Sequence, residues 1–384
     1  MYKRQVQKLV QSAFAGKPED IISQSVAKAL YGEVSPYSAT RLERFAACAF
    51  AHFLQYGMKL TERVEYEFKP MDMGNVMHEA LESFAEEVRK RGMKWTELTE
   101  QERNEIADRC LDNIVADYGN TVLKSSARNE YMIERTRRIL RRTVWALQKQ
   151  LEQGEFQPEG FEVTFGGGRI DRVDIMEDQN KVYVKVIDYK TGNTSFDLVY
   201  LYHGLQLQLM IYLDGALRVE QKKYPDKEII PAGVFYYNIK DPMIQEKIDA
   251  DVEAVSAGLM KELKMNGLVQ ADPELVYRMD SSLGSIPVAF NKDGSFRKNS
   301  SVADRTQFAV LGRYVRTKIE KIRSSILEGD AEVSPYELGK KNACTYCPYM
   351  TVCGFDRRLS GYEFRRLKNF SDEELWKAFD REAE

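Results

Sequence analysis

The feature that most constrains the fold is a pair of β-branched segments within residues 161–192, FEVTFGGGRIDRVDIM and KVYVKVIDYKTG, separated by EDQN. Alternating apolar side chains bounded by turn residues are typical of strands joined in a hairpin. If the hairpin turns about Gln179–Asn180, position 171 lies almost opposite position 188. A two-residue period also places Asp188 and Lys190 on one face of their strand. The pattern therefore predicts that Asp171, Asp188 and Lys190 converge at one sheet edge.

Helical patterns occupy most of the chain on either side of this hairpin. The expected helices cover residues 1–33, 38–57, 73–92, 99–118, 129–153, 201–219, 243–267 and 303–328, and a further strand covers 232–240. Ser38 is expected to cap the second helix, because its hydroxyl can accept hydrogen bonds from the first turn. The order of elements, helices followed by β-β-α-β and then helices, predicts an α/β core with a large helical insertion before it.

Composition narrows the class of protein. The chain has 384 residues, 43% hydrophobic and 30% charged, which is the mix of a soluble globular protein of about two domains. It contains neither a run of about 18 uncharged apolar residues nor a signal-peptide pattern, so we expect a cytoplasmic protein without a membrane span. With 56 basic and 59 acidic residues, a nucleic-acid partner would have to be held by local basic patches.

The predicted carboxylate pair has a direct chemical interpretation. Two carboxylates a few ångströms apart repel each other unless a cation lies between them, and hard oxygen ligands suit Mg²⁺ or Mn²⁺. A nearby lysine can orient a water molecule and offset charge that develops on a phosphate. The set of two aspartates and one lysine therefore predicts metal-dependent phosphodiester hydrolysis.

The alternative is that these residues are solvated charges on a hairpin, which is the ordinary role of Asp or Lys in a strand. Two details favour a site. Asp188 ends a row of apolar residues on the same strand face, namely Val182, Val184 and Val186. In addition, the glycines Gly166–Gly168 precede the first aspartate, and glycines weaken a strand unless something approaches its backbone closely.

The chain has an odd number of cysteines, Cys48, Cys110, Cys344, Cys347 and Cys353. The C-x2-C-x5-C spacing of the last three favours a metal or iron–sulfur ligand set over disulfides, and one further ligand is then needed. Cys110 shares a predicted helix face with Ile106 and Ile114, which is typical of a core cysteine. By elimination, Cys48 is the candidate for the fourth ligand. A zinc site made by the same four cysteines is the alternative to a cluster.

These motifs together resemble the RecB-like form of the PD-(D/E)XK nuclease superfamily. GRIDRVD at 168–174 and DYKTG at 188–192 match its catalytic core, and Gly74-x3-His78 matches its upstream histidine motif. Gln208 and Tyr212 match the downstream Q-x3-Y motif. One early cysteine and the late CTYCPYMTVC resemble the iron–sulfur staple found in AddB-type and CRISPR-associated members of this superfamily.

The resemblance implies a restriction-endonuclease-like core sheet flanked by helices, with a C-terminal iron–sulfur-stapled segment. The implied metal ligands are His78, Asp171, Asp188 and the carbonyl group of Tyr189. Lys190 is implied to be catalytic, and Gln208 and Tyr212 to brace the site or contact the scissile strand. Asp174 is left out because it lies on the opposite strand face. The implied ligands of one [4Fe–4S] cluster are Cys48, Cys344, Cys347 and Cys353.

We accordingly divide the chain into four consecutive segments. These are an N-terminal helical extension at 1–34, a helical part with the first cluster cysteine and the histidine at 35–158, the nuclease core at 159–330, and the cysteine-rich segment with the tail at 331–384.

Two further segments, PAGVFYYNIKDP at 231–242 and CPYMTVCGFD at 347–356, resemble the AddB family of helicase–nuclease subunits in particular. This resemblance implies a Mg²⁺-dependent DNA exonuclease domain that acts on single strands from processed duplex ends in recombination repair, with an AddA-like subunit as partner. The chain lacks the G-x4-G-K-[ST] phosphate loop of a motor, so we expect it to correspond to the nuclease domain alone. The alternatives are a stand-alone CRISPR-associated RecB-like iron–sulfur nuclease and a catalytically silent DNA-binding scaffold.

Two basic patches are candidates for phosphate contacts. The first is an arginine-rich helix with Arg135, Arg138 and Arg142, and the second contains Arg357 and Arg358 after the late cysteines. A run of charges on a helix is more often a solvated face. Next to a nuclease site, contact with the phosphates of DNA becomes the hypothesis.

Overall fold

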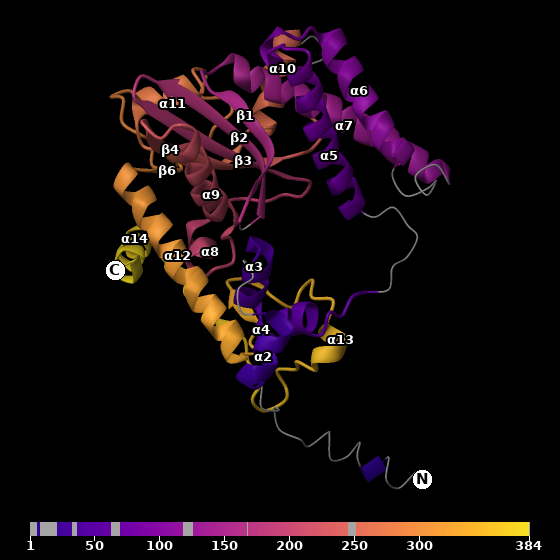
Figure 1. The fold of residues 1–384 in the computed structure, drawn as a ribbon, viewed down its shortest axis with the longest axis vertical. Coiled ribbons are helices and arrows are strands. Elements are labelled where there is room, and N and C mark those ends of the chain that lie inside the picture. The colour runs from indigo at the N-terminus through magenta and orange to yellow at the C-terminus, as the bar shows by residue number, and fades with distance from the viewer. Residues whose placement is uncertain are drawn as a thin grey trace. The chain divides into compact units, whose positions relative to one another are not determined.

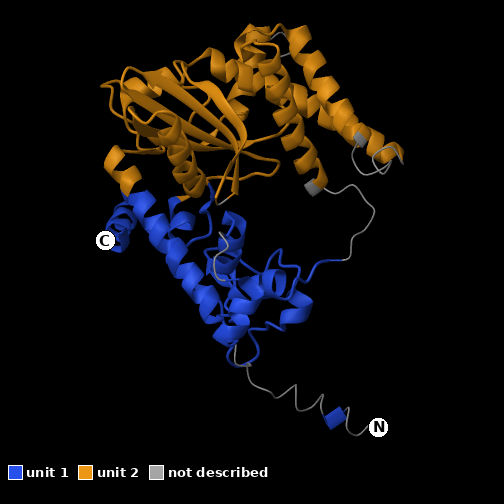
Figure 2. Ribbon diagram, viewed as in Figure 1, with its two compact units in different colours: residues 1–63, 198–208, 310–384 blue, residues 64–197, 209–309 orange. Residues whose placement is uncertain are grey.

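The structure is a computed structural model that describes residues 6–7, 21–32, 37–62, 70–117, 126–166, 168–244 and 251–383. The chain forms two compact units, each assembled from separate segments (Figure 2). Unit 1 contains residues 1–63, 198–208 and 310–384, and unit 2 contains residues 64–197 and 209–309. The four segments proposed above divide the chain consecutively, whereas these units combine segments that are distant in sequence. The four-segment division stays a prediction. Most of the predicted helix at 1–33, and Gly167 of the glycine run, lie outside the described residues.

Unit 2 is built on a mixed six-stranded sheet with the strand order β1-β2-β3-β4-β5-β6 (Figure 1). Neighbouring strands are antiparallel except for the pairs β3–β4 and β5–β6, which are parallel. The strands are β1 Gln157–Phe165, β2 Gly168–Asp178, β3 Lys181–Lys190, β4 Glu228–Asn238, β5 Asn266–Gln270 and β6 Val302–Ala303. The prediction of an α/β fold is confirmed.

The predicted hairpin is formed by β2 and β3. The chain turns at Gln179–Asn180, where Gln179 has a φ of 45°, as tight hairpin turns require. Arg172 lies opposite Ile187, so the register continues to Asp171 opposite Asp188, as predicted. The segment before Asp171 is not one strand, because the chain reverses near the glycines and β1 pairs antiparallel with β2.

Three helices share a hydrophobic core with one face of β3 and β4. They are α5 Pro70–Lys90, α6 Glu100–Asp117 and α7 Ala127–Glu152. Phe84 of α5 and Leu140 of α7 are fully buried in this core, together with Tyr189 and Tyr237 of the sheet. Both faces of β3 are buried. Alternate side chains along the strand therefore pack into two different buried layers, and neither set faces solvent. The remaining helices of this part are α9 Gln208–Lys223, α10 Val252–Glu262 and α11 Pro273–Met279.

Three predicted helices are wrong in part. The helix predicted at 201–219 is interrupted at 203–207, and the one predicted at 243–267 ends at Glu262, before β5. The third is the helix predicted at 38–57, which is not continuous. Ser38 caps α3 as expected, since its hydroxyl accepts a hydrogen bond from Arg41 N. The helix then breaks at Cys48, whose backbone is extended with a φ of −166°. The chain continues as α4 and a short π-helix. Cys48 is therefore a single non-helical residue between two helices.

The elements of unit 1 come from both ends of the chain and from residues 198–208 in its middle. They include α2 Gln24–Tyr31, α3 Ala39–Ala47, α4 Ala49–His52, the π-helix Phe53–Gly57, α8 Leu198–Tyr202, α13 Met350–Cys353 and α14 Asp372–Ala383. A small sheet has the order β8-β7-β9, with β7 Tyr336–Leu338, β8 Lys341–Asn342 and β9 Arg365–Arg366. The long helix α12 runs from Arg305 to Glu328. Among the described residues, no helix combines the length and apolar character needed to cross a bilayer.

Candidate active site

The predicted acidic residues converge at one end of the sheet in unit 2. Asp171 of β2 accepts a hydrogen bond of 2.7 Å from the backbone N–H of Tyr189 and lies 3.4 Å from His78 Nδ1. On β3, Lys190 Nζ lies 2.5 Å from Asp188 Oδ2. Both aspartates are buried. The structure therefore brings together His78, Asp171, Asp188 and Lys190, as expected from the hairpin register and the upstream helix.

Close packing of α5 against the end of β3 positions His78. At Gly74, one turn before His78, a Cβ atom would lie 3.4 Å from Thr191 Oγ1, which is ordinary van der Waals contact, so α5 passes close to the residue that follows β3. The imidazole ring also stands edge-on to the ring of Tyr189, with the centroids 6.1 Å apart. The helix thus places His78 beside the carboxylate of Asp171.

Glu162 of β1 is a residue that the sequence interpretation missed. Its carboxylate is only 6% exposed and lies 3.9 Å from His78 Nδ1, and it forms an ion pair with Arg169. The donor atoms of His78, Glu162 and Asp171 all lie within 4.8 Å of one another. Glu162 also has a φ of 50°, a left-handed conformation that is unfavourable for a residue other than glycine.

One signal could have identified Glu162. The glycines before β2 mark a second hairpin turn, and the β1–β2 register places position 162 opposite position 171. Directly opposite residues in antiparallel strands carry their side chains on the same face. A hairpin interpretation that included β1 would therefore have put this carboxylate beside Asp171.

The electrostatics of the site show a surplus of negative charge. Burial lowers the pKa of His78, but hydrogen bonds to Asp171 and Glu162 outweigh this effect and raise the pKa to about 10. Burial and the nearby Asp171 carboxylate raise the pKa of Asp188 to about 7, although Lys190 and His78 lower it. Asp188 and His78 thus hold their protons to a higher pH than usual, and a bound cation could take the place of those protons.

The two helical residues of the Q-x3-Y motif have different surroundings. Tyr212 is buried in unit 2, where its ring stands edge-on to Phe165 of β1 at a centroid distance of 5.8 Å. Gln208 is the first residue of α9, and its backbone N–H donates a hydrogen bond of 2.9 Å to Glu43, which also accepts from Leu207 N. The roles suggested for Gln208 and Tyr212 stay predictions.

Asp174 lies in a different environment, a buried cluster of charges. Its carboxylate accepts hydrogen bonds from Arg172 Nε at 2.5 Å and Arg172 Nη2 at 2.9 Å, and Lys185 Nζ lies 3.0 Å away. All three side chains are buried. Because two cations already neutralise it, Asp174 has no remaining charge to offer a metal ion, in accord with its exclusion from the predicted site.

The four cysteines of the predicted staple, Cys48, Cys344, Cys347 and Cys353, line one small apolar cavity of about 30 Å³ in unit 1. Burial, together with the charge that the other three thiolates would carry, raises the pKa of Cys344 to about 12. The backbone N–H of Phe355 donates to Cys353 Sγ at 3.5 Å. Cys110 is instead buried in the core of unit 2 beside Ile106 and Ile114, which is the environment predicted for it.

The candidate DNA-contacting arginines fall in different units. On α7, Arg138 forms a 2.6 Å ion pair with Asp241, and the guanidinium group of Arg142 lies 5.1 Å from the centre of the Trp145 ring. In unit 1, Arg358 pairs with Asp356 at 2.5 Å, and Arg357 lies over the ring of Phe364. Whether these residues contact DNA stays a prediction.

Comparisons with known proteins identify the family of the chain. The family model described as the PD-(D/E)XK nuclease superfamily matches residues 36–354. The chain is 42% identical, over 98% of its length, to the AddB component of an ATP-dependent helicase/deoxyribonuclease from Lachnoclostridium phytofermentans, of which it covers 34%. The protein of the same name from Thermoanaerobacter sp. is 34% identical over 100% of this chain, which covers 35% of that protein. The one from Clostridium acetobutylicum is 35% identical over 94% of this chain, which covers 33% of that protein.

The chain thus spans about a third of the length of the curated relatives it matches. The family match extends over the hairpin, the histidine helix and the late cysteines, so the predicted fold class is confirmed. The chain belongs to the PD-(D/E)XK nuclease superfamily.

Proposed function

We propose that this chain hydrolyses phosphodiester bonds of DNA at a divalent metal ion held between β1, β2, β3 and α5. The observation that carries the proposal is the convergence of donor atoms from His78, Glu162 and Asp171 within 4.8 Å, beside the Asp188–Lys190 pair. Carboxylate oxygens with one imidazole suit Mg²⁺ or Mn²⁺. The raised pKa values of His78 and Asp188 support the fit, because they report a site that lacks positive charge.

Each residue of the site would have a separate role. Asp171 and Asp188 would hold the ion, with His78, Glu162 and the carbonyl group of Tyr189 as further donors. The ion would activate a water molecule and stabilise negative charge on the phosphate. Lys190 would offset charge that develops on the phosphate oxygens, since its ammonium group is held at the edge of the site by Asp188.

The names of the relatives point to the substrate and partner. They are AddB components of ATP-dependent helicase/deoxyribonucleases, which supports DNA as the substrate and an AddA-like protein as the partner. We infer that the chain acts as an exonuclease on single strands from processed duplex ends in the cytoplasm. The complete Asp–Asp–Lys set favours this function over a catalytically silent scaffold.

We further propose that the four cysteines of unit 1 bind a [4Fe–4S] cluster. The four thiols line one apolar cavity, and their spacing in the sequence resembles the iron–sulfur staple of this superfamily, which supports the cluster. Zinc held by the same four thiolates is the alternative cofactor.

The first prediction tests the reaction. The 384-residue chain should degrade a labelled single-stranded DNA in the presence of Mg²⁺ or Mn²⁺, and chelation by EDTA should stop the reaction. The measurement is product length over time on a denaturing gel. If the protein binds the DNA and Mn²⁺ but leaves the strand intact, the silent-scaffold alternative is correct and the proposed activity is wrong.

The second prediction concerns Glu162. Glu162→Gln should weaken Mn²⁺ binding by about 10- to 100-fold, because loss of one ligand or supporting carboxylate commonly has an effect of this size. The measurement is calorimetric titration of the metal ion without DNA. Glu159→Gln is the matched control on the same strand, since its carboxylate pairs with Lys223 at 2.7 Å. Equal Mn²⁺ affinity in Glu162→Gln and wild type would show that Glu162 only holds Arg169.

A further inference from the structure

A wide groove in unit 2 lies outside the candidate active site. It has a volume of about 660 Å³ and is lined by residues of α6, α7 and α10. Its lining contains arginines of α7, the aromatic residues Tyr131 and Trp145, and apolar residues of α10 such as Val252. Tyr131 is 65% exposed and Val252 is 81% exposed. Guanidinium groups thus alternate with accessible apolar and aromatic surface in one groove.

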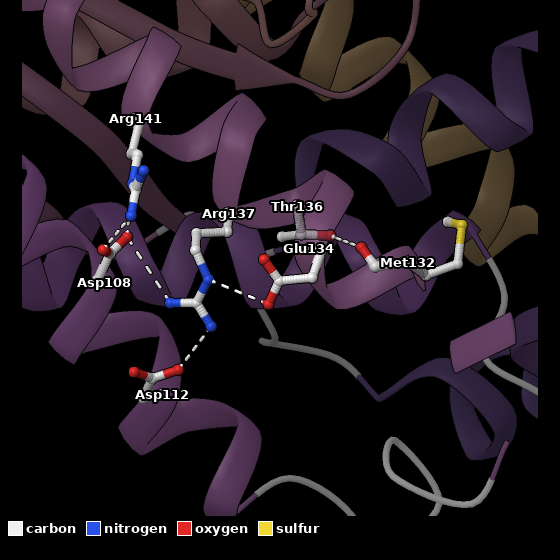
Figure 3. Close-up of polar contacts among 7 residues, drawn as sticks. All are labelled: Asp108, Asp112, Met132, Glu134, Thr136, Arg137 and Arg141. Atoms are coloured by element: carbon white, nitrogen blue, oxygen red, sulfur yellow. Dashed lines mark hydrogen bonds and ion pairs between the residues drawn. The ribbon is translucent and has the colours of Figure 1, made fainter. Parts of the chain in front are cut away.

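The arginines of α7 fall into two classes. Arg137 forms ion pairs with Asp108 and Asp112 of α6 and with Glu134, and Arg141 pairs with Asp108 (Figure 3). These contacts fasten α7 to α6, so both guanidinium groups already have acidic partners. Such pairing leaves them little net charge for a ligand.

Arg135 and Arg142 differ from these arginines. Neither forms an ion pair with an acidic side chain in the part of the chain that the structure describes. Arg142 instead lies over the ring of Trp145, which is half-buried against the core and holds the guanidinium group in place. Positive charges that track a backbone, with aromatic faces on which bases stack, are the features that bind single-stranded nucleic acids.

The groove is connected to the candidate active site through Arg138. This residue lines the groove and pairs with Asp241, which follows shortly after the end of β4. At that end, Asn238 pairs with Lys190, and Ile239 N donates a 2.7 Å hydrogen bond to the Lys190 carbonyl. One border of the groove therefore lies at the same sheet end as Lys190.

We propose that this groove binds single-stranded DNA and guides the strand toward the Asp171–Asp188 site, with Arg135 and Arg142 on the phosphates and Tyr131 under a base. The proposal rests on the proposed function for the choice of ligand. An acidic protein segment would use the arginines equally well, but the exposed ring of Tyr131 beside them is the surface on which a base stacks.

The test measures binding of a fluorescein-labelled oligothymidylate to the full chain by anisotropy, in EDTA and over a series of salt concentrations. Arg135→Ala/Arg142→Ala should weaken binding at least about tenfold and reduce the salt slope by about 1.4, which corresponds to two lost phosphate contacts on a single strand. Tyr131→Ala should weaken binding by about five- to a hundredfold with an unchanged slope, because it removes stacking. The charge-matched control is Lys292→Ala/Lys298→Ala, which alters two exposed lysines outside the groove.

Two results would overturn the proposal. One is equal affinity in the wild type and the groove variants, or an equal loss in the lysine control, which would indicate unspecific attraction. The other is binding of polyglutamate, but not of oligothymidylate, with sensitivity to the same arginines, which would make the groove a protein-docking surface. The assay needs no cleavage. Wild-type chain that binds oligothymidylate through these residues but does not cut it with Mg²⁺ would refute the proposed function and leave the groove assignment standing.

Discussion

Asp188→Asn is expected to lower the rate of DNA cleavage by about 10²–10³-fold or more while the protein stays folded. The substitution removes a carboxylate that would hold the metal ion, and it removes the partner of Lys190, whose Nζ lies 2.5 Å from Asp188 Oδ2. The measurement is single-turnover cleavage of labelled single-stranded DNA at saturating Mg²⁺.

The same variant should be no less stable than the wild type in EDTA. Burial and the Asp171 charge raise the pKa of Asp188 from 3.8 to about 7 in the folded chain, so the fold loses stability as the pH rises between these two values, and the loss is complete above about pH 7. Asn removes this unfavourable charge, and the unfolding temperature should therefore hold or rise at alkaline pH. Asp226→Asn, at an exposed turn position of the same unit, is the control and should change neither quantity. Full activity in Asp188→Asn would refute the metal site.

Cys48→Ser is expected to abolish the iron–sulfur cluster and to loosen the C-terminal segment of unit 1. Wild-type protein purified without oxygen should be brown and should contain iron and sulfide, whereas this variant should be colourless. The cysteine lies far from the other three in sequence, so the cluster would close a very long loop. Its loss should make the chain after Ala343 sensitive to protease, which limited proteolysis measures.

Cys110→Ser provides the matched control for the cluster. This thiol is buried in the core of unit 2, so its replacement should preserve the colour and the iron content. Loss of colour in Cys110→Ser with retention in Cys48→Ser would show that the fourth ligand is misassigned. Stoichiometric zinc without iron in the anaerobic wild type would leave the cysteine group intact and overturn the cofactor.

The hairpin and the grouping of its charged residues were predictable because they depend on local rules. A two-residue side-chain period and a tight turn at Gln179–Asn180 are sufficient to place Asp171 opposite Asp188 and Lys190 on the face of Asp188. The cap at Ser38 is local in the same sense, since a single hydroxyl within one turn of the helix forms it. The helix break at Cys48 could not be predicted from local rules, because neither glycine nor proline occupies that position.

Features that depend on contacts between distant elements were decided by the tertiary structure. Glu162 is an intermediate case: the glycines before β2 mark the hairpin that places β1 beside β2, whereas the left-handed conformation of Glu162, with a φ of 50°, is not visible in the sequence pattern. The α7 arginines look equivalent in sequence, yet packing against α6 neutralises Arg137 and Arg141 and leaves Arg135 and Arg142 without an ion pair among the described residues. Periodicity specifies which face a side chain occupies, whereas its partners, and hence its charge and chemistry, depend on which elements pack against that face.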